Sequence, residues 1–101
     1  MSTTRLDMTD SIERTLAERG ARYGNFPEVA QTAQSLKLTL RTAVDRRGCP
    51  VEVRQALDAI ADKLARIVNG DPTYVDNWHD IQGYARLVED AIEGGCDAQR
   101  G

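Results

Sequence analysis

The fold of this chain is decided by the stretch VEVRQALDAIADKLARIVN, residues 51–69. Its apolar side chains recur at alternating steps of four and three residues, at Val53, Leu57, Ile60, Leu64 and Ile67. This spacing places an apolar residue on one face of an α-helix at every turn. The pattern therefore predicts a helix over 51–69, opened by Pro50 and closed by the turn that follows.

Three more helices are predicted from the helix-capping and helix-breaking residues on either side of this segment. Asp10 with Glu13 is typical of a capping box, and Gly20 of a helix end, which together predict a helix over 10–19. Pro27 suits the first turn of a second helix, over 27–46. Thr73 with Asp76 predicts a second capping box and a last helix over 73–93.

Four helices joined by short connections predict an all-α fold, a compact antiparallel four-helix bundle forming a single domain over 1–101. The ends, 1–7 and 94–101, are polar or small and are expected to be flexible tails. The helical spacing predicts central core contacts by Leu57, Ile60, Leu64, Trp78, Ile81 and Ala85.

Composition narrows the range of functions. The chain has 101 residues, a formal net charge of -3 and 41% hydrophobic residues, which is typical of a globular domain. An acidic chain is not expected to coat duplex nucleic acid, and no apolar run is long enough to span a membrane. With no secretory signal, Cys49 and Cys96 are expected to be free thiols in a reducing cytoplasm.

Charged residues cluster where the last two helices are expected to lie side by side. Lys63 and Arg66 lie one turn apart and could hold a phosphate group together. Four carboxylates lie near them and could instead hold Mg2+. The same charges could equally form ion pairs on a solvated face. The four acids are Asp58, Asp62, Asp76 and Asp80.

The segment Arg22-Tyr23-Gly24-Asn25-Phe26 joins the first two predicted helices. Tyr23 could stack on a nucleotide base, and the start of the following helix favours anions. Alternatively, Tyr23 and Phe26 could simply close the end of the bundle. A further stripe, Tyr84, Leu87 and Ala91, is not needed for the core of one chain and predicts a subunit interface in a homo-oligomer.

Several motifs together resemble a family of small bacteriophage and prophage proteins of unknown function. They are RGARYGNF at 19–26, KLARI at 63–67, NGDP at 69–72 and DNWHDIQGYA at 76–85. More distantly, the layout is similar to the all-α MazG-like nucleotide pyrophosphatases. That resemblance implies a Mg2+ site in which Asp58 and Asp62 form one acidic pair and Asp76 and Asp80 form the other.

These observations favour a phage-type protein of the host cytoplasm that binds a nucleotide-like phosphorylated ligand without turnover, as a homo-oligomer and with no cofactor. Sequestration of a nucleotide signal of bacterial immunity would suit such a protein. Two alternatives stay open: a Mg2+-dependent pyrophosphatase, and a helical module that binds a host protein. In the leading interpretation the ligand is held by Arg22, Tyr23, Lys63, Arg66 and Trp78.

Overall fold

The computed structural model describes the backbone of residues 2–100 and the side-chain surroundings of residues 11–94. Within this range the chain is all-α, as predicted, and contains no strand. The helices are α1 (Ser2–Tyr23), α2 (Phe26–Arg47), α3 (Val51–Asn69) and α4 (Val75–Arg100). The boundaries predicted for α3 are confirmed, and those of α2 differ by one residue at each end.

The ends predicted for α1 and α4 are wrong, because α1 is longer at both ends and α4 begins two residues later and extends further than predicted. Asp10 lies inside α1 and not at its start, and the helix continues through Gly20 to Tyr23. Thr73 does not cap α4, because its N–H and hydroxyl donate to the Asp71 carboxylate at 2.9 and 2.7 Å. The tails expected at 1–7 and 94–101 coincide with helix over 2–7 and 94–100, while Met1 and Gly101 lie outside the described residues.

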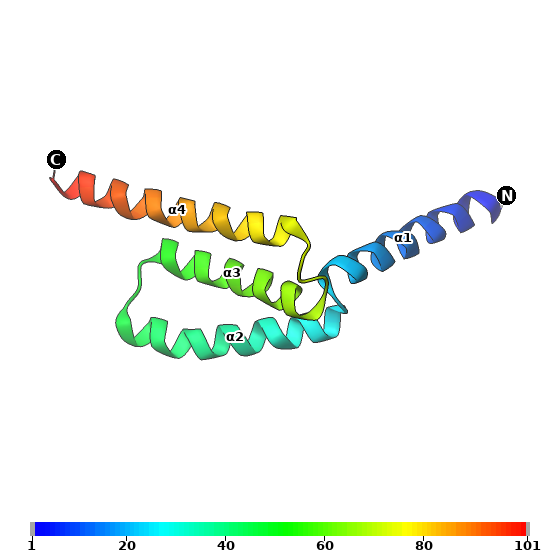
Figure 1. Cartoon of the computed structure of the whole chain (residues 1–101), viewed down its shortest axis with the longest axis horizontal. Helices are drawn as coiled ribbons and strands as arrows, with labels where there is room; N and C mark the ends of the chain where they lie inside the picture. The colour runs from blue at the N-terminus through cyan, green and yellow to red at the C-terminus, as the bar shows by residue number, and fades with distance from the viewer. Residues whose placement is uncertain (1, 101) are drawn as a thin grey trace.

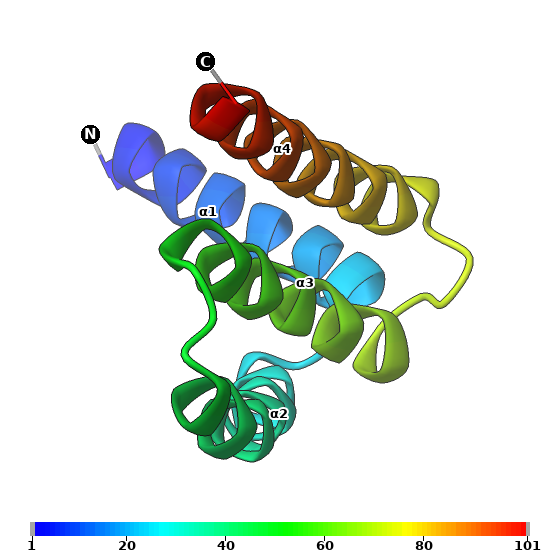
Figure 2. The same ribbon diagram turned by 90° about the vertical axis from the view of Figure 1, so that its left-hand side faces the viewer.

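The helices α2, α3 and α4 pack side by side in one layer, consistent with a helical bundle, and α1 contacts this layer only sparsely. Figures 1 and 2 show α3 between α2 and α4, and Figure 1 shows α1 leading away from one end of this layer. The molecule measures 66 × 29 × 26 Å, with a radius of gyration of 18.4 Å. A compact chain of this length would have about 13 Å. The predicted compactness is therefore wrong, although α2, α3 and α4 pack antiparallel as expected.

Small residues form the two seams of the layer. On the side of α3 that faces α2, Ala61 and Ala65 are 1% and 0% exposed. On the side that faces α4, Ala56 and Ala59 are buried, together with Asn77 of α4. Alanine lets helix backbones approach closely, so α3 is covered on two opposite sides by its neighbours.

The large apolar side chains predicted to form the core lie between these seams, along one face of the layer. On α3 this face carries Leu57, Ile60 and Leu64. At about 100° per residue around the helix axis, these three side chains lie between the directions of the two seams. Leu64 is 38% exposed and Trp78 47% exposed, because α1 does not cover them. The prediction that these residues form the centre of one chain's core is therefore wrong for Leu64, Trp78 and the exposed Ala85. In the described part of the chain, no helix combines the length and apolarity that crossing a membrane requires.

Candidate functional site

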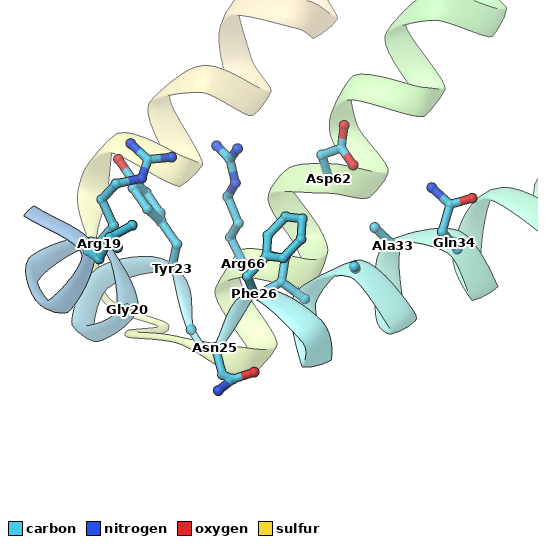
Figure 3. Close-up of a pocket in the computed structure, with 13 residues that line it drawn as sticks. Arg19, Gly20, Tyr23, Asn25, Phe26, Ala33, Gln34, Asp62 and Arg66 are labelled. Atoms are coloured by element: carbon cyan, nitrogen blue, oxygen red, sulfur yellow. The ribbon is translucent and has the colours of Figure 1, made fainter. Parts of the chain in front are cut away.

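A cavity of about 630 Å3 lies where α1, α2 and α3 meet. The cavity is lined by the last turns of α1, the turn before α2, the first turns of α2 and one face of α3 (Figure 3). Its volume is within the range of small-molecule sites. The side chains that give it chemical character are Arg19, Tyr23, Asn25, Phe26, Gln34, Asp62 and Arg66.

Two arginines approach the same aromatic ring in this cavity. The guanidinium carbon of Arg19 lies 5.1 Å from the centre of the Tyr23 ring, and that of Arg66 lies 5.0 Å from it. Figure 3 shows the side chains of Arg19 and Arg66 next to Tyr23. Cation–π attraction holds each of the two guanidinium groups beside the Tyr23 ring.

A second aromatic–arginine pair continues this cluster toward α4. The Tyr74 ring meets the Tyr23 ring edge-on, with centroids 5.7 Å apart, and the Arg22 guanidinium lies 5.5 Å from the Tyr74 centroid. The Tyr74 hydroxyl donates to the Asp76 carboxylate at 3.0 Å. This hydrogen bond raises the pKa of Tyr74, so the phenol stays neutral at physiological pH.

Backbone contacts between two turns fix the position of the cluster. The Asp71 N–H donates to the Arg22 carbonyl at 3.0 Å, which joins the α3–α4 turn to the end of α1. Gly24, at φ 94°, packs directly on the backbone of Asn69. Asn25 then caps α2 by accepting from the Glu28 N–H. Tyr23 and Arg66 are therefore held together by segments more than forty residues apart in the sequence.

The arginines of the cavity differ from the two lysines of the layer. Lys37 pairs with Asp62 and Lys63 with Asp80, each at 2.9 Å. Among the residues whose side chains the structure describes, no salt bridge includes Arg19, Arg22 or Arg66. The site therefore carries a local excess of positive charge on a chain that is acidic overall. Such an excess favours an anionic ligand.

No family model, no curated protein and no solved structure matches the chain. The geometry of the site and the general chemistry of its residues therefore carry the functional interpretation.

The structure brings together only part of the ligand set predicted from the sequence. Tyr23 and Arg66 line the cavity, and Arg22 lies beside it in the Tyr74 pair. Lys63 does not line it, because its ammonium is engaged by Asp80 on α4. Trp78 lies elsewhere, and its indole N–H donates to the Pro72 carbonyl at 2.8 Å. Lys63 and Arg66 therefore do not form the joint phosphate grip that was predicted.

The four aspartates of the alternative metal interpretation do not converge. Asp62 turns toward Lys37 of α2, while Asp80 turns toward Lys63 from α4. Asp76 accepts from Tyr74, and Asp58 lines a separate small cavity between α2 and α3. In the described residues, no three His, Cys, Asp or Glu side chains lie close enough to share a metal ion. The described part of one chain therefore does not bring Asp58, Asp62, Asp76 and Asp80 together at one site.

Arg19 and Phe26 are members of the site that the sequence patterns do not predict. Arg19 lies four residues before Tyr23, and the two share a helix face only because α1 continues through Gly20. Ending that helix at Arg19 concealed the pair. Phe26 is 79% exposed at the first position of α2, so it does not close the end of a bundle. Its ring is free at the edge of the cavity.

The predicted interface stripe lies on the same side of the layer as Arg66. Tyr84 and Leu87 line an apolar groove of about 340 Å3 between α3 and α4, together with Val51 and Val88. Leu87 is 64% exposed, whereas Tyr84 and Ala91 are half-buried. A role of this stripe in self-association stays a prediction.

The Lys63–Asp80 pair makes a prediction about pH. The hydrogen bond and charge of Lys63 lower the pKa of Asp80 below its ordinary 3.8. The folded pKa is therefore lower than the unfolded one, so the stabilisation is present above the unfolded value and is lost as pH falls through the folded value. We expect an NMR titration of the Asp80 carboxyl to have its midpoint below 3.8, and Lys63→Met to return it toward that value. An unchanged midpoint in Lys63→Met would contradict the assignment.

Proposed function

We propose that this protein binds a small phosphorylated, nucleotide-like ligand in the cavity between α1, α2 and α3, without turnover. The observation that carries the proposal is that Arg19 and Arg66 both lie against the Tyr23 ring in the cavity, and that neither forms a salt bridge among the described residues. Guanidinium groups bind phosphate through two parallel hydrogen bonds, so this pair is suited to an anion.

Aromatic groups at the site support a ligand that carries a ring. Phe26 presents a largely exposed ring at the cavity edge, and such a ring gains apolar burial by stacking on a base. Gln34 and Asn25 supply amide groups within the same lining. Phosphate contacts by the arginines and base contacts by Phe26 would together use both ends of a nucleotide.

The separation of the acidic residues favours binding over metal-dependent hydrolysis. A pyrophosphatase of the MazG-like type needs carboxylates gathered around its metal. Here Asp62 and Asp80 are each engaged by a lysine on different sides of α3. Given the resemblance to phage proteins, we propose sequestration of a nucleotide signal of bacterial immunity, by a homo-oligomer in the host cytoplasm.

The test is calorimetric titration with mono-, di-, tri- and cyclic nucleotides, with and without Mg2+. We expect one class to bind, and Arg66→Ala or Arg19→Ala to weaken it roughly ten- to a hundredfold, because each removes a charged partner of phosphate. The matched control is Arg86→Ala, since Arg86 pairs with Asp90 on α4 and lies outside the cavity lining.

Other outcomes separate the alternatives. If Lys63→Ala weakens binding while Arg19→Ala does not, the site lies on the α3–α4 side and the proposal is wrong. Release of pyrophosphate that Asp62→Asn and Asp80→Asn abolish would support the enzyme. If no nucleotide binds, the helical module that binds a host protein becomes the better interpretation.

A further inference from the structure

One face of the layer formed by α2, α3 and α4 is apolar and has no covering element in the described residues. We call it the open face. Its middle is formed by Leu57, Ile60, Leu64 and Val68 of α3. Leu36 and Leu40 of α2 adjoin it on one side, and Trp78 and Ile92 of α4 on the other.

The position of the open face follows from the residues of α3 that contact α2 and α4. Ala61 and Ala65 face α2, and Ala56 and Lys63 face α4, so two opposite directions around α3 are occupied. These two directions divide the circumference of α3 into two halves. At about 100° per residue, Arg66 lies in one half, and Leu57 and Leu64 lie in the other. The open face is therefore the reverse of the face that holds the ligand cavity.

The exposed surface of the chain is larger than that of a typical folded monomer of its mass. Its accessible area is 7658 Å2, whereas a folded monomer of 11.2 kDa exposes roughly 5,700 Å2. The excess is about 2,000 Å2, to which α1 and the open face both contribute, and a stable interface needs only about 800 Å2 from each partner. Val68, Trp78 and Ile92 of the open face are 69%, 47% and 51% exposed.

The charge pattern of the open face fits a second copy of the same chain. In a two-fold interface each surface meets itself, so any charge near the axis meets an identical charge. The middle of the open face carries only aliphatic residues, whereas the reverse face carries Asp62 and Arg66. The open face can therefore meet itself without like-charge repulsion.

We infer that two copies of this chain pack through their open faces around a two-fold axis, and so complete the apolar core that one copy leaves uncovered. The interface is centred on Leu57, Ile60 and Leu64. It differs from the stripe of Tyr84 and Leu87, which lies on the reverse face beside Gln55. Because it lies opposite the ligand cavity, it leaves that cavity open in each copy.

The test compares the same substitution on the two faces. We expect wild-type protein to be dimeric in sedimentation and light-scattering experiments at micromolar concentration. Leu64→Glu and Val68→Glu should raise the dissociation constant by at least about a hundredfold, since a buried unpaired charge is costly. Leu87→Glu is the matched control and should leave it unchanged within a fewfold. Val68→Glu guards against misfolding, because Val68 is mostly exposed in one chain; circular dichroism checks that its helicity is intact.

Trp78 provides a second measurement, because it is the single tryptophan and lies on the open face. On dilution of wild-type protein its emission should shift to the red over the concentration range in which the mass falls. A wild-type chain that is monomeric at high micromolar concentration would overturn the inference. So would dissociation by Leu87→Glu while folded Val68→Glu stays dimeric.

Discussion

Replacing Gly24 with alanine is expected to lower the free energy of unfolding by about 3 kcal/mol or more, at the upper end of single-substitution effects. Gly24 has φ 94°, a conformation that costs other residues energy. An added Cβ would also lie 2.6 Å from the carbonyl carbon of Asn69. Backbone cannot yield there without separating the two turns that hold Tyr23 against Arg66.

Gly70 makes the reciprocal contact and should respond alike. A Cβ at Gly70 would lie 2.5 Å from the Arg22 carbonyl oxygen and 2.6 Å from the Gly24 nitrogen. The matched control is Gly20→Ala, where an added Cβ meets no described atom within 4 Å. This change should stabilise α1 by roughly 0.5–1 kcal/mol. Urea denaturation at one fixed protein concentration measures all three variants.

If Gly24→Ala and Gly70→Ala remain as stable as Gly20→Ala, the two turns do not interlock as described. Nucleotide binding by the same variants provides a second test of this contact between the turns. Variants that still fold at low temperature should bind nucleotide more weakly than wild type, because the end of α1 no longer holds Arg19 and Tyr23 opposite Arg66.

Replacing Ala65 with leucine is the second large effect, with an expected loss of about 3 kcal/mol. Ala65 is 0% exposed in the seam between α3 and α2, where a larger side chain would force the helix backbones apart. The seam also contains the 2.9 Å hydrogen bond from the Asn69 amide to the Thr32 hydroxyl, which such a separation would break.

The control for Ala65→Leu is Ala17→Leu, an exposed position on α1. Leucine and alanine are both good helix formers, so this change should alter stability by less than about 0.5 kcal/mol. Thermal and urea unfolding at equal protein concentration would check the difference. Similar stabilities of the two variants would mean that α2 and α3 are not held by a close alanine seam.

The helical periodicity of residues 51–69 predicted α3 correctly because large apolar residues recur on one face and breakers flank the segment. It could not say which molecule covers that face. Leu57 and Ile60 are only half-buried and Leu64 is exposed, whereas the buried residues of α3 in one chain are Ile67 and the alanines of the two seams. Small residues are found at close helix contacts and give no periodic signal of their own.

Helix ends explain most of what sequence analysis missed at the site. Gly20 was interpreted as a terminator, yet glycine is tolerated inside α1, and the chain breaks at Gly24, where positive φ is required. In α4, Asn77 is buried against α3 and Trp78, the next residue, is 47% exposed, so the buried face of this helix is rotated from the predicted one. The sequence predicts Tyr23 as an aromatic residue in a turn, and Arg66 as a cation one helical turn from Lys63.

The projection of α1 has a mechanical consequence. A helix of 22 residues is about 33 Å long, and α1 contacts the rest of the chain only near its last turns in the described residues. Any change in the orientation of α1 would therefore pivot about the two turns that contact each other at Gly24 and Gly70. A rotation of roughly 10° at Gly24 would carry the far end by about 6 Å. A small change in the orientation of α1, which carries Arg19, relative to α3, which carries Arg66, would thus produce a large displacement at the outer end of α1.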